Sequence, residues 1–340
     1  MNTIIKPFNI SDGNHIITNI SARYNEYYTN FIRDSQEDYI NKMKAENQIG
    51  EIDEIDNTSQ VNRHITKVNN YINRLAELKE NVELLTKKQL EAYNTAAEYI
   101  NGSKGAQMMM FVTGEGGTGT CFLIKLIMEY ANIIHGKQKG LYGSAVALAP
   151  TGAAAKVIYG HTWQAVYGKG ISKSKQKNGK RISPRTAKAV GAKLCEIKLA
   201  VLDEISMINL ETLYEISERQ KESVLAYTED KNERANNKSK AFGGIHMLFT
   251  GDFYQLRPVT GQAIYRKPTK FSSKQGQKIW LSINEYIELT ESTRFKDDKT
   301  PHMNQFLSGA RKGKVDRILL NSCSSKKTSR TRCTVDFTQQ

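Results

Sequence analysis

The sequence has little cysteine and no long apolar run. Its cysteines lie far apart, without a C-x-x-C pair or a histidine at metal-ligand spacing: Cys121, Cys195, Cys323 and Cys333. This pattern argues against a structural zinc site and for a reducing compartment. No segment approaches 18 apolar residues, and the apolar run in the first ten residues is too short for a signal peptide. The composition therefore predicts a soluble intracellular protein that has no membrane span.

Acidic residues are scarce relative to basic ones. The 49 Lys and Arg against 35 Asp and Glu give a formal charge of +14, which favours a polyanionic partner such as nucleic acid. Residues 169–198 carry ten Lys or Arg against one Glu, and residues 311–333 carry eight against one Asp. The polar segment 168–193, broken by Gly and Pro, is either a solvated loop or a loop that follows a nucleic-acid backbone.

The chain divides into three parts by pattern. Residues 1–83 predict a helical, partly flexible lead-in, with helical spacing at 21–46 and 61–85. Residues 84–315 predict one α/β domain. Residues 316–340 are polar and without periodicity, which predicts a disordered basic tail.

Short apolar runs in the middle part predict buried strands. They are MMMFVTG (108–114), SAVALAP (144–150), LAVLDEIS (199–206) and HMLFTGD (246–252). Runs of this length suit a parallel sheet that is buried on both faces. The crossover helices are predicted at 120–135, 152–167 and 209–226, and residues 227–244 are predicted to be a polar excursion. Alternating strands and helices predict a doubly wound sheet, in which ligands bind at the carboxyl ends of the strands.

The first strand is followed by a glycine-rich loop. Gly114 and Gly119 have the spacing of the phosphate-binding pattern G-x-x-x-x-G-K-[ST]. In that context the backbone N–H groups of 116–121 would surround phosphates. However, Thr120 occupies the lysine position and Cys121 the hydroxyl position. A glycine-rich turn without a ligand is the alternative.

Acidic residues follow two of the other strands. Asp203 can hold Mg²⁺ and Glu204 can activate a water, although an Asp-Glu pair after a strand is also a common helix start. Gly251, Asp252 and Gln255 follow the last strand, where a turn capped by Asp252 is the alternative.

The segment after the second strand offers groups for nucleic acid. Gly152 and the small residues after it would let a nucleic-acid backbone approach closely, and Thr151 and Lys156 are available to phosphates. Polar and stacking groups for bases are offered by His161, Thr162, Trp163 and Tyr167. Alternatively, the Ala153–Ala155 run is only a good helix former and Trp163 belongs to the core.

Taken in order, these motifs resemble the first motor domain of Pif1-like DNA helicases of superfamily 1B. The resemblance covers residues 84–315 and rests on GEGGTGTC (114–121), APTGAAAKVIYGHT (149–162), LAVLDEISMI (199–208), GDFYQLRPV (251–259) and LTESTRF (289–295). LTKKQLEAYNTA (85–96) is similar to the family's entry motif, and FLSGARKGKV (306–315) is similar to a later helix. The implied fold is a P-loop, RecA-like domain.

The resemblance also implies cofactors, a partner and residue roles. The implied cofactors are ATP and Mg²⁺, and the implied partner is single-stranded DNA. The implied catalytic residues are Asp203, Glu204, Gln255 and Arg294, with Asp203 at the metal. The implied nucleotide contacts are Gln89 for adenine and Gly114, Gly116, Gly117, Thr118, Gly119, Thr120 and Cys121 for phosphates. The implied DNA contacts are Thr151, Gly152, Lys156, His161 and Thr162. Unwinding from 5′ to 3′ in repair, recombination or telomere maintenance, in the nucleus of a eukaryote, is implied in the same way.

The sequence departs from the family in two respects. Thr120 replaces the lysine of the loop, and this loss should slow phosphoryl transfer by roughly 10²–10³-fold. Cys121 replaces the hydroxyl residue, and its thiol is a soft ligand that binds the hard Mg²⁺ ion poorly. Lys125, one turn further along, would point along a different face. The second motor domain is expected to be absent, which together with the altered loop favours a degenerate helicase copy.

Three functions therefore stand as hypotheses. The first is an ATP-dependent DNA helicase whose turnover is impaired. The second is a non-catalytic remnant that binds single-stranded nucleic acid. The third is an ATP-gated module that acts on a protein partner through residues 1–83.

Overall fold

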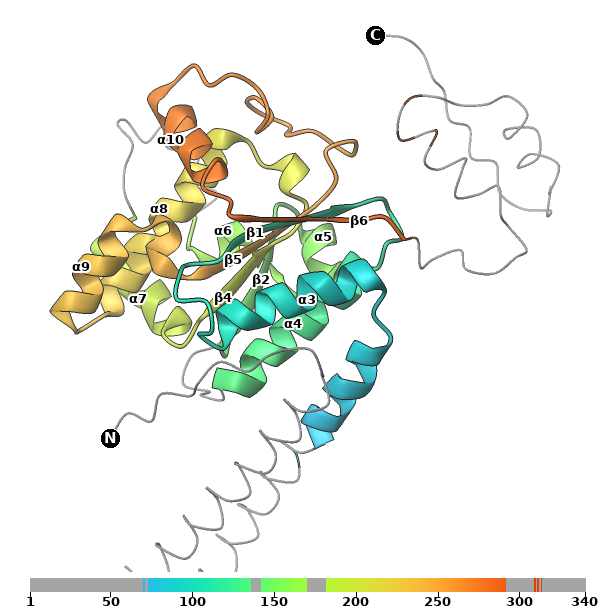
Figure 1. Ribbon diagram of the computed structural model, residues 1–340. Helices are drawn as coiled ribbons and strands as arrows, with labels where there is room; N and C mark the ends of the chain where they lie inside the picture. The colour runs from blue at the N-terminus through green and yellow to red at the C-terminus, as the bar shows by residue number, and fades with distance from the viewer. Residues whose placement is uncertain are drawn as a thin grey trace, which may run out of the picture.

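A computed structural model describes residues 70, 73–135, 142–169, 182–291, 309, 311 and 313 (Figure 1). The helix expected at 21–46 and the tail expected at 316–340 lie outside these residues, and the helix expected at 61–85 is described only from residue 70 on. Residues 73–83 are helical, and Leu75 and Leu78 of this helix are buried in the main core. The described C-terminal part of the predicted lead-in thus packs directly on the α/β domain.

The centre of the domain is a six-stranded sheet in the order β3-β2-β4-β5-β1-β6, and every pairing is parallel. The strands are β1 (Met109–Gly114), β2 (Ala145–Ala149), β3 (His161–Thr162), β4 (Leu199–Leu202), β5 (His246–Thr250) and β6 (Glu285–Leu289). The four predicted strands are confirmed, three of them within two residues at each end, while β4 ends four residues before the end of the 199–206 run. The doubly wound, parallel fold class is confirmed with them.

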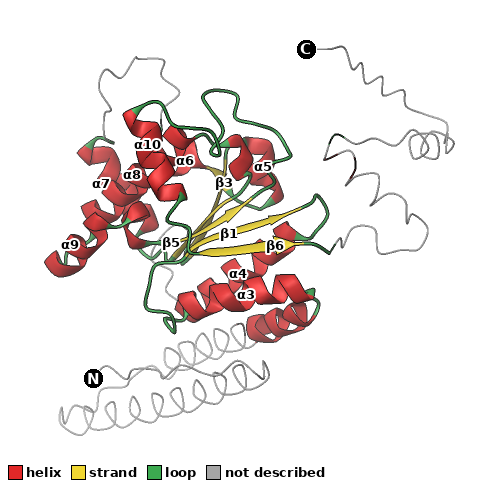
Figure 2. Ribbon diagram, turned by 45° about the horizontal axis from the view of Figure 1, so that its top comes forward, coloured by secondary structure: helices red, strands yellow, loops and turns green. Residues whose placement is uncertain are grey.

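Helices cover both faces of the sheet, as Figures 1 and 2 show. Alternate residues of β1 divide between the two faces: Met110 and Val112 belong to one apolar cluster, and Met109 and Phe111 belong to the other. The first face is covered by α3 (Lys87–Ile100), α4 (Thr120–His135) and α5 (Gly152–Val157). The opposite face is covered by α6 (Trp163–Val166), α7 (Pro184–Leu194), α8 (Leu210–Tyr227) and α10 (Phe271–Trp280).

Two of the predicted segments differ from the structure. The helix predicted over 152–167 is divided into α5, β3 and α6, because His161 and Thr162 pair with Leu148 and Ala149 of β2. Part of the predicted loop 168–193 is the helix α7, whose N-cap residue is Ser183. Residues 170–181 of that loop lie outside the described part of the chain.

The polar excursion predicted at 227–244 contains α9 (Lys231–Ser239), none of whose residues is buried. Short 3₁₀ turns occupy Ile205–Met207 after β4 and Ala241–Gly244 before β5. Within the described ranges, no helix combines the length and the apolar character that crossing a membrane requires.

Candidate functional site

Three of the predicted motifs meet at one edge of the sheet. Because β4, β5 and β1 are neighbours and parallel, the residues that follow them lie at the same carboxyl edge. Side chains connect the strand ends: the Thr250 hydroxyl donates to Asp203 Oδ1 at 2.6 Å, and the Thr113 hydroxyl donates to the Gly251 carbonyl at 2.9 Å. The sheet thus brings the glycine-rich loop, the acidic pair and the Gly251–Asp252 turn together.

The glycine-rich loop runs from the end of β1 to the first turn of α4. Gly117 and Gly119 have φ of 101° and 76°, values that favour glycine. Thr118 is buried, and both its backbone N–H and its hydroxyl donate to the Glu115 carbonyl, at 3.1 and 2.9 Å. This closed turn before the N-terminus of a 16-residue helix is the arrangement that binds phosphate through backbone N–H groups.

The side chains of Thr120 and Cys121 do not replace the lysine and the hydroxyl group of the phosphate-binding pattern. Thr120 is half-buried, with its hydroxyl 3.5 Å from that of Thr118, and Cys121 is exposed. Lys125 is exposed on α4, one turn further along the helix. The backbone of the loop therefore fits a phosphate chain, while positions 120 and 121 provide neither a cation nor a hard oxygen ligand in the usual places.

Gln89 is buried against the loop. Its Nε2 donates to the Thr118 carbonyl at 2.8 Å, and its Oε1 accepts the Thr86 backbone N–H at 2.9 Å. The side chain thereby ties the start of α3 to the phosphate loop. Its implied contact with adenine stays a prediction.

The acidic pair is desolvated. Asp203 is 8% exposed, and burial raises the pKa of its carboxyl despite the hydrogen bond from Thr250. Burial, followed by the charges of Asp203 and Asp252, also raises the pKa of Glu204. Glu204 has φ of 53°, a strained value for a residue with a side chain. A carboxylate with a raised pKa and a fixed, unusual backbone is suited to accept a proton from water.

Asp252 is held by Arg311, which lies in the FLSGARKGKV motif (306–315) but was not predicted to belong to the site. Arg311 donates from Nε and Nη2 to the two Asp252 oxygens, at 2.7 and 2.9 Å, and from Nη1 to Glu115 Oε1 at 3.0 Å. Gln255 is exposed and anchored through its backbone N–H to the Asp252 carbonyl. Arg294, the other predicted arginine, lies outside the described residues.

The set predicted to contact nucleic acid lies at the far side of the same edge, after β2. Thr151 caps α5 and Thr162 caps α6, so both hydroxyls accept backbone N–H groups. Gly152, Lys156 and His161 are exposed. Two strands, β4 and β5, separate this set from the phosphate loop.

The structure contradicts the prediction that Trp163 and Tyr167 are available for stacking on bases. Trp163 and Tyr167 are 3% and 0% exposed, and the Tyr167 hydroxyl donates to Gln220 Oε1 at 2.7 Å. The core interpretation of Trp163 is the right one. The aromatic ring that reaches solvent is Tyr159, which is 90% exposed with φ of 52°. Its exposure could not be inferred from the helical pattern around it.

A metal ion would have few ligands from the chain alone. No group of three or more His, Cys, Asp or Glu side chains gathers within the described residues. Mg²⁺ in nucleotide sites is held by one or two carboxylates together with phosphate oxygens and water. Asp203 therefore fits such an ion only with a phosphate present.

Comparison with known proteins places these features in one family. A family model described as PIF1-like helicase matches residues 84–317. The chain is 32% identical over 188 residues to the ATP-dependent DNA helicase PIF1 of Candida albicans, which covers 53% of this chain and 18% of that protein. It is 28% identical over 218 residues to the ATP-dependent DNA helicase Pif1 of Bdellovibrio bacteriovorus, which covers 61% of this chain and 40% of that protein.

The fold agrees with a solved structure. The crystal structure of the Pif1 helicase from Candida albicans aligns with a TM-score of 0.52 at 26% identity, over 73% of this chain and 48% of that chain. The chain therefore spans less than half the length of these relatives.

Proposed function

The chain belongs to the PIF1-like helicase family, and from this premise we propose that it is the nucleotide- and DNA-binding part of an ATP-dependent DNA helicase. The observation that carries the proposal is the meeting of the phosphate loop, the Asp203–Glu204 pair and the Asp252 turn at one sheet edge. In the proposal ATP binds at that edge and single-stranded DNA binds beyond β2.

In the nucleotide site each residue has a separate task. The loop residues Gly114, Gly116, Gly117, Thr118, Gly119, Thr120 and Cys121 surround the phosphates, and Gln89 positions the loop and reads adenine. Asp203 holds Mg²⁺, which when bound offsets the charge on the phosphates. Glu204 orients the attacking water and takes its proton, a role that its raised pKa favours. Gln255 and Arg294 contact the terminal phosphate.

In the DNA site, exposed and capping residues of the segment after β2 contact the strand. Gly152, Lys156 and His161 are exposed there, and Thr151 and Thr162 lie at the starts of two short helices. Tyr159 adds an exposed ring on which a base can stack. These contacts are sequence-tolerant, because they address the backbone and the faces of the bases.

Turnover is proposed to be slow in this chain. Thr120 leaves the terminal phosphates without the usual lysine, and Cys121 leaves Mg²⁺ without a hydroxyl ligand. These two positions favour a second candidate function, a non-catalytic protein that binds single-stranded nucleic acid. The two candidates differ in whether ATP alters DNA binding.

The test is ATP hydrolysis with and without single-stranded DNA, measured on the natural chain and on a Thr120→Lys/Cys121→Ser variant. The proposal expects DNA-stimulated turnover that rises by roughly 10²–10³-fold in the variant. A Glu204→Gln change in the same variant is the control for a contaminating ATPase. DNA binding without turnover in either protein, unchanged by ATP, would establish the second candidate instead.

A further inference from the structure

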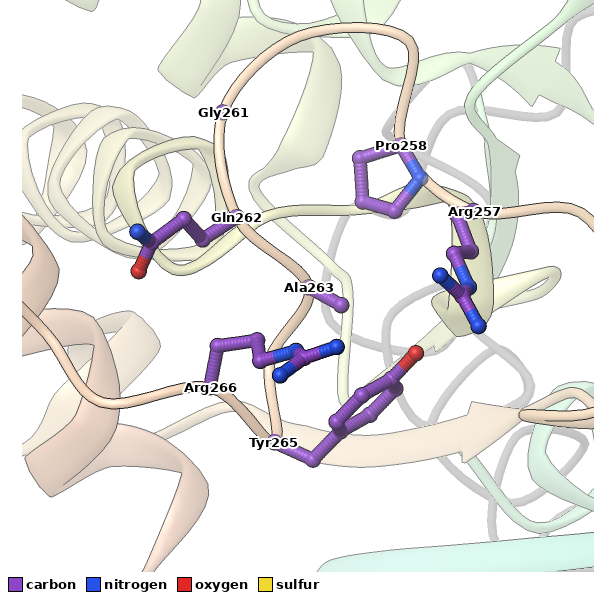
Figure 3. Close-up of a pocket in the computed structure, with 7 residues that line it drawn as sticks. All are labelled: Arg257, Pro258, Gly261, Gln262, Ala263, Tyr265 and Arg266. Carbon is purple, nitrogen blue, oxygen red and sulfur yellow. The ribbon is translucent and has the colours of Figure 1, made fainter. Parts of the chain in front are cut away.

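A basic pocket lies on the loop between β5 and α10 (Figure 3). Its volume is about 320 Å³, and it is lined by Arg257, Pro258, Gly261, Gln262, Ala263, Tyr265 and Arg266. None of these lining residues is acidic. Figure 3 shows the end of the Arg257 side chain beside the Tyr265 hydroxyl, with the Arg266 guanidinium on the other side of the ring and Gln262 pointing away.

The walls of the pocket are fixed by the core. Asn209 donates from Nδ2 to the Thr260 carbonyl at 2.6 Å and forms a backbone bridge with Ala263. Gly261, with φ of 77°, lies so close to Asn209 that a β-carbon would stand 2.7 Å from its Nδ2. The Tyr265 ring packs edge-on against Phe253, with the centroids 5.6 Å apart. A fixed backbone therefore presents these side chains.

Among the described residues, no acidic side chain neutralises the two arginines of the pocket. Arg257 and Arg266 are exposed, and neither forms an ion pair with any residue in the described ranges. By contrast, Lys270 on the same loop pairs with Glu211 at 3.1 Å. From Phe253 to Asn284 the sequence holds six Lys or Arg and no Asp or Glu. Two guanidinium groups with a phenol between them match the oxygens of a phosphate diester.

We propose that this pocket binds a backbone phosphate of single-stranded DNA through Arg257 and Arg266, with Tyr265 donating a hydrogen bond or stacking on the adjacent base. The proposal rests on the proposed function. It adds a DNA contact on the loop that follows Asp252 and Gln255. The strand would then be held at a second point of the carboxyl edge, next to the turn that carries those nucleotide-site residues.

The test compares two variants that remove the same charge from the same basic segment. Arg257→Gln/Arg266→Gln empties the pocket, and Lys274→Gln/Lys278→Gln removes two exposed lysines of α10, outside it. Binding of a labelled oligo-dT strand is measured by fluorescence anisotropy between about 50 and 200 mM salt, a range over which binding through phosphate contacts weakens steeply. Circular dichroism confirms that each variant is folded.

The pocket variant is expected to bind on the order of tenfold more weakly, and the slope of log K against log salt should fall by about 1. The α10 variant is expected to keep the natural slope. Equal changes in both variants would mean that only overall charge matters and would overturn the pocket. If the natural chain binds DNA and the pocket variant binds it equally well, the proposed pocket contact is wrong and the proposed function stands. If the natural chain binds no DNA, the proposed function is wrong as well.

A second readout is local to the site. A strand that carries 5-iodouracil should photocrosslink to Tyr265 in the natural chain and in the α10 variant. The crosslink should be lost in the pocket variant. A crosslink that survives there would show that the strand reaches Tyr265 without the arginines, which also contradicts the proposal.

Discussion

Arg311 and Asp252 form a two-point ion pair between residues 59 positions apart, with N···O distances of 2.7 and 2.9 Å. The Asp252 side chain is 2% exposed and that of Arg311 is 14% exposed. The same guanidinium bonds Glu115 of the phosphate loop and lies 4.6 Å from the centre of the Tyr254 ring. One side chain therefore links the end of β5 to the phosphate loop.

Replacing Arg311 by Ala should destabilise the domain. The change leaves the Asp252 carboxylate buried without its partner, and breaking a buried pair in this way costs about 3–5 kcal/mol. Urea unfolding at neutral pH measures the loss. Because Asp252 and Glu115 both flank the nucleotide site, nucleotide affinity should fall in the same variant.

Two further variants separate the contribution of the buried Arg311–Asp252 pair to stability from that of the more exposed Arg311–Glu115 pair. Glu115→Gln should change stability by less than about 1 kcal/mol, since its side chain is 35% exposed and its ion pair is partly screened. The double variant Asp252→Ala/Arg311→Ala should be more stable than the sum of the single losses predicts. Simple additivity of Asp252→Ala and Arg311→Ala would contradict a direct coupling.

Most of the sheet could be predicted from local sequence. The strands β1, β2, β4 and β5 consist mainly of buried apolar residues, as expected for a sheet that is covered on both faces. β6 was missed because it has no continuous apolar run. As expected for an edge strand, its residues alternate between buried and exposed, with polar side chains such as Glu285 and Glu288. The first turn of α7 did carry a signal, since Ser183 and Pro184 are a cap and first-turn pair.

The site was predictable only where its residues belong to a local motif. The phosphate loop and the acidic pair each lie directly after a strand, so topology alone brings them together. The bonds from Gln89 to Thr118 and from Arg311 to Asp252 join segments that no local pattern relates. The buried state of Trp163 and Tyr167 likewise depends on the helices packed over them, which a sequence motif does not specify.

Replacing Tyr159 by Ala should weaken binding of single-stranded DNA. The ring is 90% exposed, and removing a base-stacking ring costs about 1–3 kcal/mol of binding energy. Little stability should be lost with it, and Tyr159→Phe should bind DNA normally. Anisotropy with an oligo-dT strand measures both variants, and Tyr227→Ala, which removes a half-exposed tyrosine at the end of α8, is the matched control. Equal weakening by the two alanine changes would contradict a specific stacking role.

Replacing Asp203 by Asn should stabilise the protein while abolishing turnover. Burial raises the pKa of Asp203, so its charged form is disfavoured in the folded state at neutral pH. Asn keeps the oxygen that accepts the Thr250 hydroxyl and removes the charge, and gains of this kind are about 0.5–2 kcal/mol. Because the pKa of Asp203 is raised in the folded state, the gain in stability of the variant should be full above that pKa. It should fade as the pH falls toward the pKa of an unfolded aspartate. Thermal unfolding at two pH values measures it, and a loss of stability at neutral pH would mean that the carboxylate is needed for the fold.

His246 should make stability depend on pH in the mildly acidic range. Its Nδ1 accepts the Met108 backbone N–H at 2.9 Å, and burial, followed by the nearby charges of His135, Lys198 and Lys240, lowers its pKa to about 4. An unfolded histidine gains its proton near pH 6.5, so between about 6.5 and 4 the unfolded chain binds a proton that the folded chain does not. Stability contributed by this group should therefore be complete above pH 6.5 and fall by about 3 kcal/mol as the pH drops to 4. His246→Asn retains an acceptor for Met108 without titrating, so urea unfolding of this variant should show a shallower decline over that range. The same decline in both proteins would show that His246 binds its proton while the domain is still folded, which contradicts the lowered pKa.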